Sequence, residues 1–191
     1  MRVVNGSDGG TPQEGNARLA MASGKEDRSE EFLEHARRAY GDLQSPYYGF
    51  FSDALRDNRW KPLLDGFREF LHIEDWTDPL DVSVLYTLQP HRRSRSGWSL
   101  WLSAVGPYAL LAYGDDPDTL LARADVVTGF GENRPAEEKR IIEMLREAGL
   151  TLLSAEEIEA TVDFHPPDDR FPVSTFVMLF GESDVPWWFD G

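Results

Sequence analysis

The residues best placed to do chemistry lie in one short segment near the C-terminus. Three carboxylates and one imidazole fall within seven residues there, at Asp163, His165, Asp168 and Asp169. Hard divalent cations prefer oxygen ligands, and imidazole suits several transition metals. This cluster can therefore serve a metal-assisted hydrolase, with further ligands supplied by His72 or Glu74. The alternative is a polar turn, since Asp and Pro are common turn residues, and on that interpretation we predict no catalytic residue, metal or cofactor.

Motifs of other reactions are absent from the sequence. It contains no Gly-x-Ser-x-Gly elbow, no Gly-Lys-Ser/Thr phosphate loop and no dinucleotide-binding fingerprint. It also contains no cysteine, which excludes thiolate catalysis, disulfides and zinc sites built on sulfur. These observations favour a protein that binds rather than one that catalyses.

The chain is strongly acidic, with 34 Asp and Glu against 19 Lys and Arg and a net charge of -15. Such a charge repels phosphate backbones and anionic lipid surfaces, so we expect neither nucleic acid nor a membrane as a partner. It attracts basic proteins over long range and speeds their association. Only the segment His91–Arg95 concentrates positive charge, and it is either a solvated loop or a contact for a phosphate or an acidic peptide.

Two features are candidate partner-binding surfaces. The first is aromatic and lies at the end of the chain: Trp187, Trp188 and Phe189. Tryptophan is enriched at binding hot spots, although such a tail can also dock on its own domain or anchor a homodimer. The second is acidic and follows a predicted helix start: Glu156, Glu157 and Glu159.

Apolar periodicity predicts the helices that position these groups. Residues 1–25 lack it and are predicted to form a flexible N-terminal tail, followed by a single domain over residues 26–191. Apolar residues at helical spacing predict helices over residues 27–43, after Pro46, from Pro62 to Leu71, from Pro135 to Ala148, and from Ser154 onward. His72 would then lie at the end of the third of these helices.

The middle of the chain has the patterns of β-strands. Residues 81–89 alternate in polarity, and apolar runs follow at 98–105 and 108–113. We predict three antiparallel strands with a turn at Gly106–Pro107, or alternatively one bent strand with a bulge there. Trp98 and Trp101 differ by three positions, and side chains an odd number of positions apart on a strand face opposite sides of the sheet. Residues 172–180 are apolar on both faces, which predicts a central C-terminal strand.

These elements indicate an α+β fold, in which an antiparallel sheet of about four or five strands packs against helices. No run of about 18 apolar residues and no secretory signal is present, so a cytoplasmic location is expected. We predict a non-catalytic acidic protein-binding module, such as an inhibitor of the immunity-protein type, whose partner is a basic protein. The metal-assisted hydrolase is the alternative function.

Overall fold

The computed structural model describes residues 28–43, 46–78, 81–91, 96–114, 125–129, 134–164 and 173–181. The predicted N-terminal tail, residues 1–25, lies outside these ranges. The chain divides into two compact units, of which the second begins at Phe32. Both hydrophobic cores and the central sheet lie within this second unit. Among the described residues, no helix is both long and apolar enough to span a bilayer.

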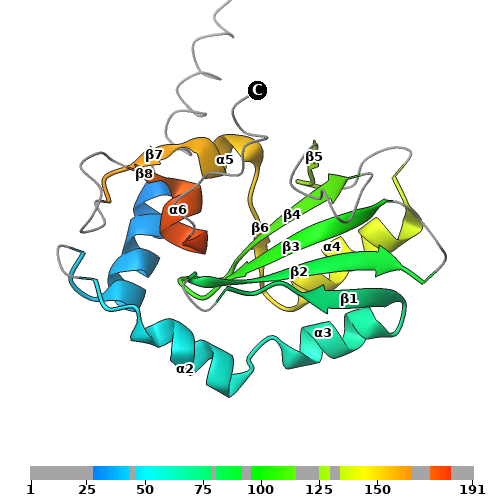
Figure 1. Ribbon diagram of the computed structural model, residues 1–191. Coiled ribbons are helices and arrows are strands. Elements are labelled where there is room, and N and C mark those ends of the chain that lie inside the picture. Colours follow the sequence, from blue (N-terminus) through cyan, green and yellow to red (C-terminus); the bar gives the residue numbers. More distant parts are fainter. Residues whose placement is uncertain are drawn as a thin grey trace, which may run out of the picture. The chain divides into compact units, whose positions relative to one another are not determined.

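A mostly antiparallel sheet forms the centre of the fold (Figure 1). Its strands in order are β1 (Leu71–Asp75), β2 (Ser83–Pro90), β3 (Gly97–Ser103), β4 (Tyr108–Gly114) and the short β5 (Asp125–Val126). A sixth strand, β6 (Thr151–Leu152), pairs with β4 in parallel and makes the sheet mixed. The α+β fold class is therefore confirmed. The predicted meander corresponds to β2, β3 and β4, and Gly106–Pro107 lies in the turn between β3 and β4 rather than in a bulge.

The strand β1 was not expected, because the third predicted helix was extended too far. Helix α3 (Lys61–Arg68) ends three residues before Leu71, and β1 begins there. His72 therefore lies on a strand and not at a helix end. The physical reason is local: from Leu71 the apolar residues recur at every second position, Leu71 and Ile73, which suits a strand with one face inward.

One face of the sheet is covered by α3 and by α4 (Ala136–Glu147), which runs behind the strands in Figure 1. Helix α2 (Gly49–Asp57) adds the buried ring of Phe51 to the same core. Trp98 belongs to this core, and its side chain is fully buried. The remaining inward positions are mostly aliphatic: Leu63, Leu64, Leu88, Leu100, Leu111, Ile141, Ile142 and Leu145.

The opposite face carries a second core. Residues 28–40 are helical, and Phe32, Ala36 and Tyr40 pack there with Trp101, Tyr108 and Leu110 of the sheet. Helices α5 (Ala155–Glu159) and α6 (Thr175–Phe180) complete it, together with a two-stranded ribbon of β7 (Thr161–Val162) and β8 (Val173–Ser174). Trp98 and Trp101 thus lie in different cores, which confirms that they face opposite sides of the sheet.

The predicted central strand over residues 172–180 is wrong. Only Val173–Ser174 is a strand, in the small ribbon, and Thr175–Phe180 forms α6. The Ser174 side chain accepts a hydrogen bond from the Val177 N–H at 3.3 Å and so caps the helix start. A helix that is apolar all round is as fully buried as a central strand, so the composition of this run suits both.

Three buried hydroxyl groups hold the end of α6 to the rest of the unit. Tyr40 donates to the Met178 carbonyl at 2.8 Å, Ser103 to the Leu179 carbonyl at 2.5 Å, and Ser83 to the Phe180 carbonyl at 2.9 Å. The last carbonyls of a helix have no partner within the helix itself. Here these three side chains satisfy them, which explains why polar Ser83 and Ser103 are buried in the sheet.

Candidate functional site

The predicted metal cluster is only partly within the described residues. Asp163 is exposed just after β7, whereas His165, Asp168 and Asp169 lie outside the described ranges. His72 and Glu74, the suggested further ligands, are neighbours on β1, with His72 Nε2 3.3 Å from Glu74 Oε1. Across the residues that the structure describes, no group of three or more metal-ligating side chains comes together.

The predicted partner-binding residues have different environments. Trp187, Trp188 and Phe189 lie outside the described residues. Glu157 is engaged in a capping box at the start of α5, where its carboxylate accepts from the Ser154 N–H at 2.8 Å. Glu156 and Glu159 are exposed on the same helix. The acidic face of α5 therefore consists of these two residues, with Glu157 serving the helix itself.

Histidine positions show what sequence patterns missed. His35 is half-buried, and its Nδ1 lies 2.6 Å from the Tyr108 hydroxyl. His91 is exposed at the end of β2, and the remainder of the basic segment, residues 92–95, lies outside the described ranges. The His35–Tyr108 contact ties the first helix to β4 and has an ordinary structural explanation.

The outer edge of β1 is the first surface that stands out in the structure. Among the described residues, β1 is the end strand of the sheet and pairs only with β2. The Trp76 N–H donates to the Leu85 carbonyl at 2.8 Å, so the alternation of an antiparallel pair directs the N–H and C=O groups of Ile73 and Asp75 outward. No further strand pairs with β1 within the described part of the chain, so no ladder bond meets these outward groups. This edge can accept another strand.

The side chains along that edge are acidic and aromatic. Glu74 and Asp75 are exposed, and Trp76 follows them with 59% of its surface accessible. An exposed tryptophan of this kind is uncommon, because burying its ring removes a large apolar area from water. We call the segment Ile73–Trp76 the β1 edge. No strand was predicted over these residues, because the third helix was predicted to reach Leu71 and to end near His72.

Tyr86, which pairs with Asp75 across the two strands, makes stability near the β1 edge dependent on alkaline pH. Burial, and secondarily the Asp75 carboxylate, raise the pKa of Tyr86 to about 12 against an opposing effect of Arg68. An unfolded tyrosine ionises at about pH 10. The stabilisation by buried, neutral Tyr86 is therefore fully present below that pH and is lost as the pH rises through the folded pKa. The free energy of unfolding, measured with urea, should fall by up to about 1 kcal/mol per pH unit in this window. Tyr86→Phe should reduce that slope, and the remainder comes from Tyr40, whose pKa is also raised by burial. An unchanged slope would contradict the assignment.

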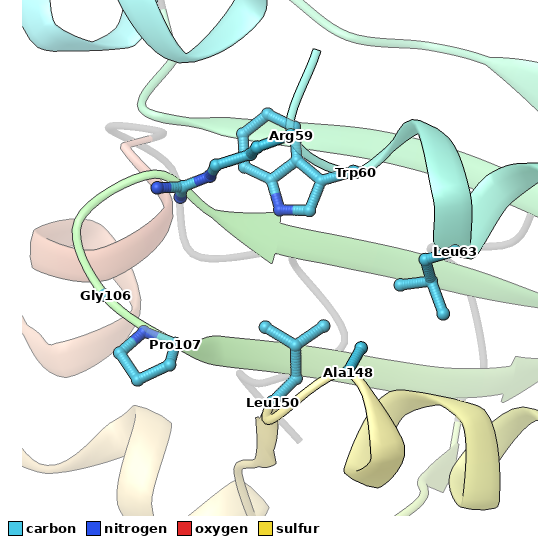
Figure 2. A pocket seen from close by; sticks show the side chains of 7 residues that line it. All are labelled: Arg59, Trp60, Leu63, Gly106, Pro107, Ala148 and Leu150. Carbon is cyan, nitrogen blue, oxygen red and sulfur yellow. The ribbon is translucent and has the colours of Figure 1, made fainter. Parts of the chain in front are cut away.

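A pocket of about 380 Å³ is the second feature. It lies between the start of α3, the β3–β4 turn and the segment that follows α4, and Figure 2 shows its lining side chains. The lining is mostly apolar: Trp60, Leu63, Gly106, Pro107, Ala148 and Leu150. Arg59 is the one charged residue among the described residues that line it. Sequence reasoning missed this site because its residues come from three distant parts of the chain.

Arg59 has few partners for a cation in so acidic a chain. Its guanidinium donates to the Ser103 carbonyl at 2.5 Å and lies over the Trp60 ring, 4.4 Å from the ring centroid. No ion pair joins it to a carboxylate among the described residues. A neighbouring hollow contains Asp53 and Asp57, and Arg59 forms part of its lining too. Arg59 is exposed as a residue, but partial burial of its guanidinium lowers its pKa below the usual value. Arginine remains charged at neutral pH.

No family model matches this chain, and comparison with curated proteins and with solved structures gave no match either.

Proposed function

We propose that this chain is a non-catalytic acidic binding module whose β1 edge receives an extended basic segment of a partner protein. One observation supports this proposal most strongly. Outward-facing backbone groups, two exposed carboxylates and an exposed tryptophan occur together on one sheet edge. An inhibitor of the immunity-protein type would act in this way. The proposed compartment is the cytoplasm.

Three physical effects support this assignment. Strand addition to a free sheet edge supplies main-chain hydrogen bonds, while alternate side chains give specificity. The net charge of -15 steers a basic segment toward the edge. The Trp76 ring supplies the large apolar contact typical of binding hot spots. A second copy of this chain fits poorly, because like charges placed across an interface oppose binding.

Capture experiments with matched variants test the proposal. The full chain is immobilised at low salt, retained proteins are identified by mass spectrometry, and the affinity of the retained basic protein is measured. Trp76→Ala should weaken binding at least about tenfold. Tyr47→Ala is the matched control, because Tyr47 is also exposed, at 67%, but lies outside the β1 edge. Its affinity should stay unchanged.

Charge and hydrogen-exchange measurements separate the β1 edge from α5. The pair Glu74→Gln and Asp75→Asn should slow association and reduce its salt dependence, whereas Glu156→Gln with Glu159→Gln should not. In the complex, the amides of Ile73 and Asp75 should exchange more slowly. Dependence on the α5 pair instead would move the binding surface to α5, and failure to retain any basic protein would contradict the proposed function itself.

A further inference from the structure

The pocket beside Arg59 combines an apolar interior with one cationic end. Figure 2 shows the guanidinium at the end formed by Gly106 and Pro107, while Leu63 and Ala148 lie at the other end. Only one of the five N–H groups of an arginine is needed for the bond to the Ser103 carbonyl. The guanidinium therefore keeps donors available for an acceptor brought in by a ligand.

Trp60 supplies a second donor. Trp60 is only 7% exposed, and its ring forms one wall of the pocket. In Figure 2 the indole nitrogen lies on the side of the ring that faces Leu150 across the pocket. Within the described residues, no hydrogen bond is formed by this nitrogen. The fully buried side-chain atoms without a partner do not include this nitrogen, so it is open to the pocket and can donate to a ligand there.

We propose that this pocket binds a small monocarboxylic acid with an apolar body. The carboxylate lies at the Arg59 end, where a guanidinium offers parallel donors that match two carboxylate oxygens. The Trp60 N–H donates to the same ligand. The apolar body lies against Trp60, Leu63 and Leu150, which line the remainder of the pocket.

The chemistry of the lining decides between classes of anion. A phosphate or a dicarboxylate needs several cations or many donors to replace its water, and the described residues of this pocket supply one guanidinium. The apolar walls instead favour a ligand whose uncharged part leaves water. A volume of about 380 Å³ falls at the compact end of small-molecule sites. The site shares no residue with the β1 edge, so it does not depend on the proposed function.

Titration with named acids tests the inference. Phenylacetate, 4-methylpentanoate and indole-3-acetate are added to the full ¹⁵N-labelled chain, and the tryptophan indole N–H signals are followed. The Trp60 signal is identified by its loss in Trp60→Phe. We expect saturable binding at a Kd on the order of 1 mM for at least one acid, with a shift of the Trp60 indole signal. Phenylacetamide, which has the same shape without the charge, should bind about tenfold more weakly.

Variants then locate the ligand. Arg59→Gln should reduce the affinity about tenfold, and Ala148→Phe should abolish binding by filling the pocket while leaving the charge in place. Arg56→Gln is the matched control, because Arg56 is exposed, pairs with Asp53 at 2.7 Å and does not line the pocket.

Several results would overturn the inference. The first is that none of the three acids saturates or moves the Trp60 signal up to about 10 mM. Another is equal binding of phenylacetate and phenylacetamide. A third is a peptide ending in a free phenylalanine carboxylate that binds more tightly than phenylacetate, since the site would then receive a chain terminus.

Discussion

Glu138→Ala is expected to lower the free energy of unfolding by about 3 kcal/mol, measured by urea denaturation. Glu138 is a carboxylate in the interior, with 1% of its surface exposed. It accepts a hydrogen bond from the fully buried Trp98 Nε1 at 2.8 Å. Removing the carboxylate leaves this buried N–H without an acceptor and also leaves a cavity, and each effect costs about 1 to 3 kcal/mol.

Arg134, the cation beside Glu138, contributes less to stability than the Trp98–Glu138 hydrogen bond. Arg134 Nη1 lies 3.8 Å from Glu138 Oε2, and its guanidinium lies 5.1 Å from the centroid of the Tyr113 ring. Glu138→Gln keeps an acceptor oxygen for Trp98 and nearly the same volume, so it should cost about half as much as the alanine variant. Glu143→Ala is the control on the same helix. Glu143 is exposed and pairs with Lys139 at 3.7 Å, and its loss should change stability by less than about 0.5 kcal/mol.

A double-mutant cycle isolates the Trp98–Glu138 bond. Trp98→Phe leaves the buried carboxylate without its donor and should also cost about 3 kcal/mol. The cycle uses Trp98→Phe, Glu138→Leu and the double variant with both substitutions, in which neither partner is left unsatisfied. The double variant should then be less destabilised than the sum of the two single variants by at least about 1 kcal/mol. Strict additivity would show that the hydrogen bond has no coupling energy.

The buried role of Glu138 shows a limit of sequence patterns. Paired acids at a helix start have a sufficient explanation in the helix dipole, and Glu137–Glu138 fits that pattern at the start of α4. What distinguishes Glu138 is its position on the inward face beside Ile141, Ile142 and Leu145. Helical spacing places Glu138 on this apolar face, but its partner Trp98 is distant in sequence. Spacing within the helix does not reveal that partner.

Strands were predicted well where alternation and turn residues agreed. Polar and apolar residues alternate in β2, and Gly106–Pro107 separates the next two strands, so the meander followed directly. The run 172–180 contains no alternation, and an apolar segment without periodicity suits a buried helix and a buried strand alike. Ser174 and Gly181 cap α6 at its two ends, and these two residues are the local features that distinguish a helix from a strand here.

The sequence indicates the pocket beside Arg59 only weakly, through Arg59 itself. Positions three and four residues on either side of Arg59 hold Leu55, Arg56, Pro62 and Leu63, so none offers a carboxylate for a helical ion pair. In a chain with 34 acidic residues, such an arginine is notable. The pattern identifies a cation without a local partner. It does not identify the walls, because those come from the β3–β4 turn and the segment after α4.

Gly181→Ala is expected to destabilise the fold by about 3 kcal/mol. Gly181 ends α6 with φ +96°, a conformation that L side chains rarely adopt. A Cβ atom there would lie 2.5 Å from the Val82 backbone nitrogen. The left-handed conformation alone costs about 1 to 2 kcal/mol, and forcing the backbone of residues 81 and 82 away adds a similar amount.

Gly149→Ala separates these two costs. Gly149 has φ +76° just after α4, but a Cβ atom there would meet nothing within 4 Å. It should therefore cost only about 1 kcal/mol. The difference of about 2 kcal/mol measures the contact with Val82. That contact matters because the carbonyls of Leu179 and Phe180 accept the buried hydroxyl bonds from Ser103 and Ser83. If the two glycine variants proved equally stable, α6 would be free to move from the sheet without loss, and those hydroxyl bonds could not be what fixes it.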